Sequence, residues 1–170
     1  RKPLIVMTPK SLLRHKRCVS NINEFISKSS FHRVLEDDAY EKRNNLISLK
    51  KDNQIKKVVM CSGKIYYDLI EEREKTKKND IVFVRIEQLY PFPAKTLAKV
   101  LKKYKKAEFI WCQEEPKNMG AWNTARNYIE RTLEMINFKD INIKFVGRSA
   151  SSTTATGNAN KHLAQQKEIL

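Results

Sequence analysis

Two adjacent carboxylates, Glu114 and Glu115, occupy the position in this sequence that most favours a functional role. They follow the apolar run 109–112, whose length and polar boundaries are typical of a buried strand. Pro116 comes next, and because proline has no backbone N–H to donate, it predicts the end of that strand. From residue 122 onward, apolar side chains recur at steps of three and four, which predicts a helix. In an open α/β sheet, functional residues tend to lie in the loop between such a strand and helix.

The two carboxylates allow two interpretations, and the sequence leaves both open. In the first, they form a charged turn and an acidic first helical turn, where the helix dipole favours negative charge. In the second, they form a contact surface for a neighbouring domain or subunit. Asn118 and Gly120 add turn-forming residues to the same loop.

The other residues with reactive side chains do not form a recognisable catalytic or metal-binding set. Cys18, Cys61 and Cys112 include no C-x-x-C pair, and two of them lie in or beside apolar runs. We therefore expect reduced, unpaired thiols in an intracellular protein. The histidines are scattered, so neither a zinc site nor a Ser–His or Cys–His pair can be argued from spacing.

Two loops of small residues follow apolar runs. Ser62-Gly63-Lys64 lies between a predicted strand and a predicted helix, where small residues can cradle a phosphate. The segment contains neither a G-x-G-x-x-G nor a Walker motif, so close packing of the turn is the competing interpretation. The second loop, 147–157, is rich in Gly, Ser, Thr and Ala and precedes a short polar helix.

The composition is that of a basic globular chain, with 170 residues and a formal net charge of +15. This length corresponds to one domain, 1–170, that can bury about 70% of its unfolded surface. The lysines of 95–106 share one helical face without interleaved aromatic residues, so a solvated face is favoured over nucleic-acid binding. No apolar run approaches about 18 residues, and no signal-peptide pattern opens the chain, so we expect no membrane span. Because the sequence begins with Arg1, we expect it to be part of a longer protein.

Strands and helices are expected to alternate along most of the chain. This order is typical of βα units with right-handed crossovers and a mostly parallel sheet. The charged segment 36–54 is expected to run over the surface, with a hairpin at 46–49. The expected strands are 4–7, 31–35, 58–61, 81–84, 109–112 and 141–146, and the expected helices are 9–17 (capped by Thr8), 65–78, 94–106, 122–136 and 158–169.

Five motifs, taken in order, resemble one enzyme family. The chain opens with R-K-P-L-I-V-M-T-P-K-S-L-L-R-H and continues with V-M-C-S-G-K-I-Y-Y-D-L. It then contains V-R-I-E-Q-L-Y-P-F-P, W-C-Q-E-E-P-K-N-M-G-A-W and F-V-G-R-S-A-S. Together, from Lys2 to about His162, these motifs resemble the C-terminal domain of the thiamine-diphosphate-dependent 2-oxoglutarate dehydrogenases. The third and fourth motifs are also similar to transketolase-type C-terminal domains, so those two alone would indicate only the superfamily.

The resemblance implies an α/β fold, namely a transketolase C-terminal-like, three-layer domain with a mixed, mostly parallel five-stranded sheet between helices. It implies a homodimeric parent enzyme that uses thiamine diphosphate and Mg. That parent decarboxylates 2-oxoglutarate and passes the succinyl group to the lipoyl arm of the dihydrolipoyl succinyltransferase component. The family's G-D-G cofactor motif does not occur here, so the cofactors and catalytic residues are expected on upstream domains. The implied location is the cytoplasm in a bacterium or the mitochondrial matrix in a eukaryote.

The resemblance also implies two groups of functional residues. Some family members sense acetyl-CoA or nucleotides, and we expect an anion to bind at Arg148, Ser151 or Thr156. This loop departs from the family pattern G-R-P-A-S-A-S-P-A-T-G by losing both prolines. Polar loops after the strands are expected to contact the upstream domains or the second subunit. The residues expected at this contact are Glu87, Gln88, Glu114, Glu115 and Asn118.

Three hypotheses for the function remain at this level. The first is a scaffolding and regulatory domain of a 2-oxoglutarate dehydrogenase. The second is the C-terminal domain of another thiamine enzyme, such as a transketolase or a branched-chain 2-oxo acid dehydrogenase. The opening T-P-K-S-L-L-R-H favours the first over the second. The third is a basic nucleic-acid-binding module, which the scattered lysines disfavour.

Overall fold

The chain forms two compact units in the computed structural model, which describes residues 2–26, 28–41 and 46–170. The first unit is Arg1–Phe31 and contains the 3-10 helices η1 (Lys10–Arg14) and η2 (Ile22–Glu24). The second unit, His32–Leu170, contains the sheet. The expectation of a single domain over 1–170 remains a prediction.

A five-stranded sheet in the order β1-β3-β2-β4-β5 forms the centre of the second unit. Strands β2, β3, β4 and β5 run parallel to one another, whereas β1 pairs antiparallel with β3. The sheet is therefore mixed and mostly parallel, which confirms the predicted α/β class. The strands are β1 (Val34–Leu35), β2 (Lys57–Cys61), β3 (Ile81–Ile86), β4 (Glu108–Pro116) and β5 (Lys144–Arg148).

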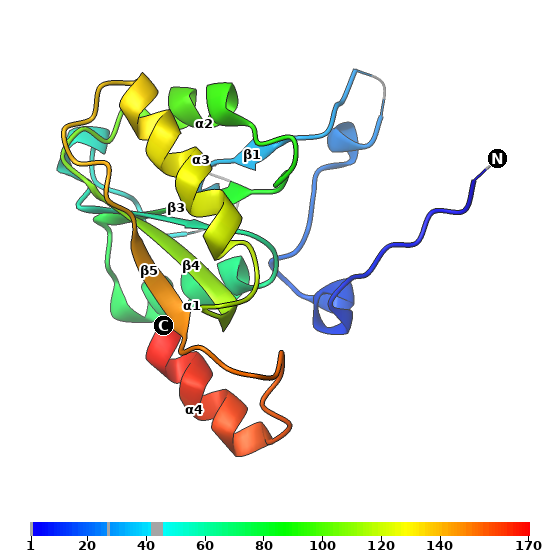
Figure 1. Ribbon diagram of the computed structural model, residues 1–170. Coiled ribbons are helices and arrows are strands. Elements are labelled where there is room, and N and C mark those ends of the chain that lie inside the picture. The colour runs from blue at the N-terminus through cyan, green and yellow to red at the C-terminus, as the bar shows by residue number, and fades with distance from the viewer. Residues whose placement is uncertain (1, 27, 42–45) are drawn as a thin grey trace. The chain divides into compact units, whose positions relative to one another are not determined.

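The α-helices of the second unit cover both faces of the sheet, which gives the predicted three layers (Figure 1). Helices α2 and α3 pack against each other on one face, and α1 and α4 contact strands from the other face. The helices are α1 (Ile65–Thr76), α2 (Ala94–Leu101), α3 (Trp122–Met135) and α4 (Ala159–Ile169).

The main apolar core lies between the sheet and the α2–α3 layer. On β2, Val58 and Met60 belong to this core, whereas Val59 lines a cavity beside α1, as the period-two alternation of a strand requires. Trp111 of β4 and Trp122 of α3 join the same core and are 1% and 6% exposed. The apolar stripe predicted after residue 121 therefore faces the sheet.

A buried ion pair holds the segment before β2 against the sheet. Asp37 accepts hydrogen bonds from both Nη atoms of Arg73 in α1 and from the backbone N–H of Phe83, the last at 2.8 Å. Both charged side chains are buried, and pairing is what makes their burial tolerable. The prediction of a hairpin at 46–49 is wrong. Those residues form no strand, and the 3-10 helix Asp52–Gln54 follows them.

The first unit differs from its sequence prediction. The run 4–7 was expected to be a buried strand, but Leu4 and Met7 are 87% and 91% exposed and no strand forms there. A strand requires a partner for its backbone hydrogen bonds, and within the described residues nothing pairs with this run. The helix predicted at 9–17 is reduced to η1, with Pro9 rather than Thr8 at its N-cap.

Several element boundaries differ from the predicted ones. Strand β4 continues to Pro116, which pairs with Arg148 of the edge strand β5 beyond a register shift. The missing proline donor therefore falls in an already irregular part of the ladder. Helix α1 ends at Thr76 because Lys77 adopts a left-handed φ of 52°. Helix α2 ends at Leu101, five residues before its predicted end at residue 106.

Candidate regulatory and contact site

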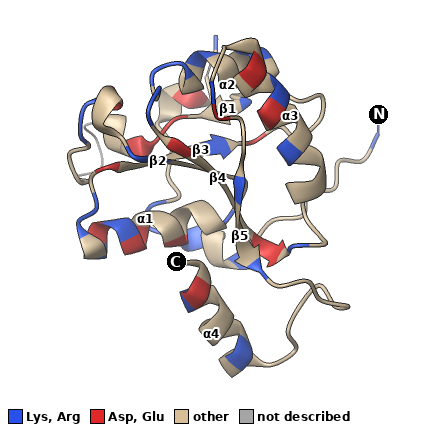
Figure 2. Ribbon diagram, turned by 60° about the vertical axis from the view of Figure 1, so that its left-hand side comes forward, with Lys and Arg blue, Asp and Glu red and all other residues tan. Residues whose placement is uncertain are grey.

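The loops that follow the parallel strands meet at one edge of the sheet. Parallel strands point in the same direction, so the residues after their carboxyl ends share an edge, where ligands and partners commonly bind. At this edge the acidic end of β4 lies beside the basic end of β5, where Pro116 pairs with Arg148 (Figure 2). Both groups of predicted site residues lie on these loops or at these strand ends.

Gln113 of β4 organises the loop that carries the two carboxylates. Its Oε1 accepts hydrogen bonds from the indole N–H of Trp111 at 2.9 Å and from the backbone N–H of Trp122 at 3.0 Å. Its Nε2 donates to three backbone carbonyl groups of the loop, those of Glu115, Pro116 and Met119. One buried amide therefore fixes the loop between β4 and α3.

Glu114 is held by a lysine at the start of α1. The Nζ of Lys64 lies 3.0 Å from Glu114 Oε1 and 2.9 Å from Asp68 Oδ2. Burial opposes the charge of Lys64, but the hydrogen bonds that its ammonium group donates to Asp68 and Glu114, with the negative charge of both, outweigh burial and raise its pKa. The first turn of α3 contains no acidic residue, so the interpretation of the carboxylates as an acidic helical turn is wrong.

Arg148, one of the predicted anion-binding residues, is linked to this cluster through α4. Its Nη2 donates to Gln166 Oε1 at 3.1 Å and lies 2.9 Å from His162 Nδ1. The Nε2 of Gln166 donates in turn to Asp68 Oδ2 at 2.9 Å. A continuous chain of side-chain contacts therefore runs from the carboxylate of Glu114 to the guanidinium group of Arg148.

The predicted anion-binding residues line one small pocket. Arg148, Ser151 and Thr156 surround a space of about 60 Å³, together with Lys161 and Gln165 of α4. The Nε of Arg148 is buried and has no hydrogen-bond partner within the described part of the chain. The pocket lining thus combines two cationic side chains with several Ser and Thr hydroxyl groups, and Arg148 also has an unused buried donor; these are the groups that bind oxyanions.

Asn118 joins the predicted contact loop to the predicted anion loop. Its Nδ2 donates to the carbonyl of Ser151 at 2.9 Å, and its Oδ1 accepts from the backbone N–H of Ser151 at 3.0 Å. Thr156 donates to the carbonyl of Asn158, whose side chain caps α4 by accepting from the N–H of Lys161. The loop without its family prolines is therefore tied down at both ends by side-chain hydrogen bonds.

The remaining predicted contact residues are more dispersed. Glu115 is exposed next to Glu114. Glu87 and Gln88 follow β3, where both backbone N–H groups donate to the carbonyl of Arg33 and the Gln88 side chain donates to the carbonyl of Pro91. No hydrogen bond among the described residues connects these two side chains to Glu114.

The sequence did not predict several residues of the site, nor the reason why position 63 is a glycine. Lys64 and Asp68 lie at the start of α1 and Gln166 lies in α4, and only the i,i+4 spacing of the first two is visible as a sequence pattern. The turn before α1 was interpreted as either phosphate-binding or closely packed. A Cβ on Gly63 would meet nothing within 4 Å, so its φ of +76°, rather than close packing, accounts for glycine there.

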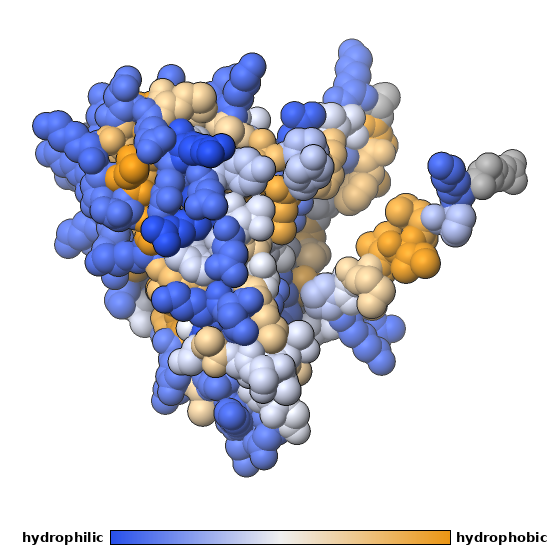
Figure 3. Space-filling view, in the orientation of Figure 1, coloured by the Kyte–Doolittle hydropathy of each residue, from blue (hydrophilic) through white to orange (hydrophobic). Residues whose placement is uncertain are grey.

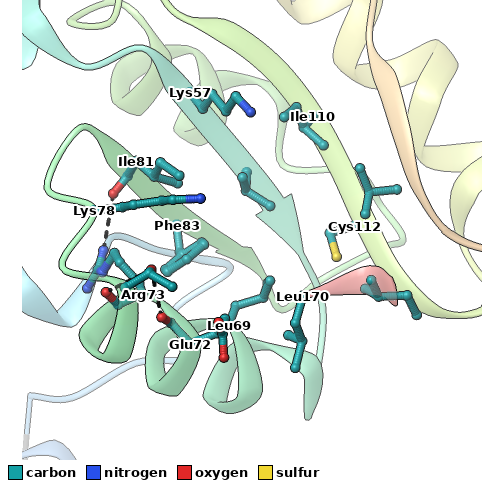
Figure 4. Close-up of a pocket in the computed structure, with 14 residues that line it drawn as sticks. Lys57, Leu69, Glu72, Arg73, Lys78, Ile81, Phe83, Ile110, Cys112 and Leu170 are labelled. Carbon is teal, nitrogen blue, oxygen red and sulfur yellow. Dashed lines mark hydrogen bonds between the residues drawn. The ribbon is translucent and has the colours of Figure 1, made fainter. Parts of the chain in front are cut away.

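A second cavity, of about 200 Å³, lies between the sheet, α1 and the end of α4 (Figure 4). Its floor includes Phe83 and Ile110, and the side chains of Lys57 and Lys78 also line it. Cys112 lines the same cavity, and burial raises the pKa of its thiol to about 12. The thiol therefore stays protonated, consistent with a role as a small apolar side chain.

Fold and site together define a class: three-layer α/β domains whose mostly parallel sheet carries polar contact loops at its carboxyl edge. A protein-family profile described as 2-oxoglutarate dehydrogenase C-terminal matches residues 19–170. The chain belongs to this family, which confirms the resemblance identified from its motifs.

Curated relatives are similar to the whole of this chain. The 2-oxoglutarate dehydrogenase E1 component of Brucella anthropi is 56% identical over 170 residues, and that of Brucella ovis is 54% identical over the same length. Each alignment covers 100% of this chain but 17% of the relative. The chain therefore spans about a sixth of the length of the relatives it matches. Within residues 2–26, 28–41 and 46–170, no helix is long and apolar enough to cross a membrane.

Proposed function

We propose that this chain is the C-terminal part of a 2-oxoglutarate dehydrogenase E1 component, in which it has a scaffolding and regulatory role. The observation that carries the proposal is 56% identity to such a component over all 170 residues. The parent enzyme decarboxylates 2-oxoglutarate in the tricarboxylic acid cycle and passes the succinyl group to the lipoyl arm of dihydrolipoyl succinyltransferase. Thiamine diphosphate, Mg and the catalytic residues belong to the upstream domains. The parent is a homodimer, located in the cytoplasm of a bacterium or the mitochondrial matrix of a eukaryote.

The carboxyl edge of the sheet serves as the contact surface within that enzyme. Glu115 is exposed, and the partly exposed carboxylate of Glu114 is oriented by Lys64. The buried amide of Gln113 keeps this loop in one conformation, which lowers the entropy lost when a partner binds. Glu87, Gln88 and Asn118 extend the surface along the same edge. Its partners are the upstream domains of the same chain or the second subunit.

The Arg148 pocket serves as the regulatory anion site. A phosphate group carried by a nucleotide or by acetyl-CoA would accept hydrogen bonds from Arg148 and Ser151, and from Thr156 once its hydroxyl turns from the carbonyl of Asn158, with Lys161 adding positive charge. Occupation of this pocket draws the guanidinium group away from Gln166, which also donates to Asp68. The same contacts end at Glu114, so the arrangement links anion binding to the contact surface.

The full-length enzyme provides the test of both roles. Purified with thiamine diphosphate and Mg, it should decarboxylate 2-oxoglutarate and succinylate a lipoyl domain, and failure to do so would contradict the assignment to this enzyme. Titration with acetyl-CoA and with AMP should change the rate. Arg148→Ala should raise the effector concentration that gives half of the maximal effect about tenfold or more. The reason is that a hydrogen bond to a charged group contributes about 1.5–3 kcal/mol. Lys167→Ala, near the other end of α4, is the matched control. An unchanged response in Arg148→Ala would remove the regulatory role and leave the enzymatic one.

A further inference from the structure

The apolar run Leu4–Met7 is exposed, although its sequence is that of a buried strand. Its four consecutive side chains are 69–91% exposed. In the space-filling view they form a continuous hydrophobic segment close to the N-terminus (Figure 3). Soluble proteins rarely leave such a run in water, and larger exposed apolar patches usually mark an interaction surface.

The backbone of this run is as unpartnered as its side chains. Among the described residues, no backbone hydrogen bond involves Leu4, Ile5, Val6 or Met7. Neighbouring segments of the first unit do make such bonds, for example from the N–H of Leu12 to the carbonyl of Pro9 at 3.0 Å. The segment therefore has unused backbone donors and acceptors, and its apolar side chains would occupy both faces of a strand. These are the properties of a strand that lacks its sheet.

The run lies before the region that the C-terminal family profile matches, although the E1 relatives align with it. The family match begins at residue 19 and continues to residue 170. The Brucella relatives nevertheless align with all 170 residues, and this chain spans 17% of their length. The segment before residue 19 is therefore shared with the E1 components and lies outside the region that the C-terminal family profile matches.

We propose that Leu4–Met7 is a buried strand in the sheet of the domain that precedes this one in the same polypeptide. Leu4 and Val6 point to one face of such a strand and Ile5 and Met7 to the other, so apolar residues on both faces indicate a sheet covered by helices on both sides. Pro9 ends the strand because it lacks a donor. The inference rests on the proposed function only in taking the chain as part of a longer E1 component. It assigns the first residues to the upstream domain and so replaces the single domain 1–170.

The same polypeptide is a better partner than a second subunit. The run is covalently continuous with the upstream residues, and consecutive elements of a chain usually lie next to each other in space. A tethered segment also has a high effective concentration for a neighbouring sheet edge, which a separate subunit does not provide. Docking to a second subunit is therefore the alternative outcome of the test.

Hydrogen–deuterium exchange on the full-length, cofactor-loaded enzyme tests the inference without any substitution. The amides of Leu4–Met7 should exchange about 100-fold or more slowly than in an unstructured peptide, because buried strands open only rarely. Exchange at the unstructured rate in an enzyme that decarboxylates 2-oxoglutarate would overturn the inference and leave the proposed function intact. Slow exchange in a chain without that activity would contradict the proposed function and support the strand.

Two substitutions and a cross-link define the environment of the strand. Ile5→Ser and Val6→Ser point to opposite faces, and each should lower the melting temperature of the full-length enzyme by several degrees, whereas Lys16→Ser should not. An effect at only one of the two positions would contradict burial on both faces. A photoreactive amino acid at Met7 should cross-link within one polypeptide and leave the denatured mass at that of a monomer. A dimer-sized product would assign the strand to the second subunit and overturn the inference.

Discussion

Replacing Gln113 with leucine should destabilise the His32–Leu170 unit although it adds apolar surface to the core. The substitution keeps a similar side-chain volume but removes an amide with five hydrogen bonds. The indole N–H of Trp111 and the backbone N–H of Trp122 then lose their acceptor. Both residues are buried, so water cannot replace the lost bonds without opening the core.

The expected loss follows from the two orphaned donors. Each buried donor left without a partner costs about 1–3 kcal/mol. The three carbonyl groups released by the substitution add little where water reaches the loop, and the apolar leucine offsets part of the loss. A decrease of about 2–5 kcal/mol in the free energy of unfolding is therefore expected. For a domain of this size it corresponds to a drop of about 5–20 °C in melting temperature.

Urea unfolding followed by tryptophan fluorescence and by circular dichroism measures this change. Gln54→Leu is the matched control, because Gln54 is exposed and its backbone N–H, rather than its side chain, donates a hydrogen bond, to the carbonyl of Lys51 at 2.7 Å. The control should shift the free energy by no more than about 0.5 kcal/mol. A loss below about 1 kcal/mol in Gln113→Leu would refute the view that this amide holds the loop.

Gln113→Glu separates the accepting role of the side chain from its donating role. A carboxyl group keeps an acceptor for the two tryptophan donors, but when ionised it faces three carbonyl groups in a buried position. Burial and these carbonyls should raise the pKa of the new carboxyl above its unfolded value of about 4.3. Stability is then greatest below that value and falls as the pH rises through the folded pKa. A stability that rises over the same pH range relative to wild type would contradict this environment.

Three further outcomes are expected. Trp122→Ala should cost about 3–5 kcal/mol, measured by urea unfolding, because the indole is 6% exposed and packs 5.1 Å from the ring of Phe145. Glu114→Gln combined with Glu115→Gln should change the stability of this chain by less than about 1 kcal/mol, since partly exposed ion pairs contribute little. In the full-length enzyme the same pair should weaken the dimer in sedimentation or lower the activity, and an intact, fully active dimer would contradict the contact surface. At pH 8, a thiol reagent should modify exposed Cys18 rapidly and the buried thiols, including Cys112, only after unfolding, because burial both blocks access and raises the Cys112 pKa to about 12. Rapid modification of more than one thiol in the folded chain would show that the core opens readily.

The elements of the sheet were largely predictable because their signals are local. Strands β2, β3 and β4 are continuous apolar runs, and such runs are typical of parallel strands buried on both faces. Helices α1 and α3 follow from apolar stripes at steps of three and four. Boundaries were less predictable, as at Pro116, because pairing with a neighbouring strand decides where a ladder ends.

The motifs were informative in a different way. They identified the family and the strand-end loops, and three of the predicted residues, Arg148, Ser151 and Thr156, line one pocket. The apolar run 4–7 predicts a buried strand, but whether such a run is buried depends on a partner. An apolar run specifies that it needs a partner and not where that partner lies.

The connections across the site were decided by the tertiary structure alone. Lys64 contacts Glu114, and Gln166 bridges Asp68 and Arg148, although these residues come from separate elements. The sheet order β2-β4-β5 places β4 beside both of its parallel neighbours, and α1 and α4 then lie close enough to exchange hydrogen bonds. Charged and amide side chains pair with whatever partner the chain path brings within about 3 Å. The residue types were therefore visible in the sequence, whereas their partners depended on the order in which the strands assemble.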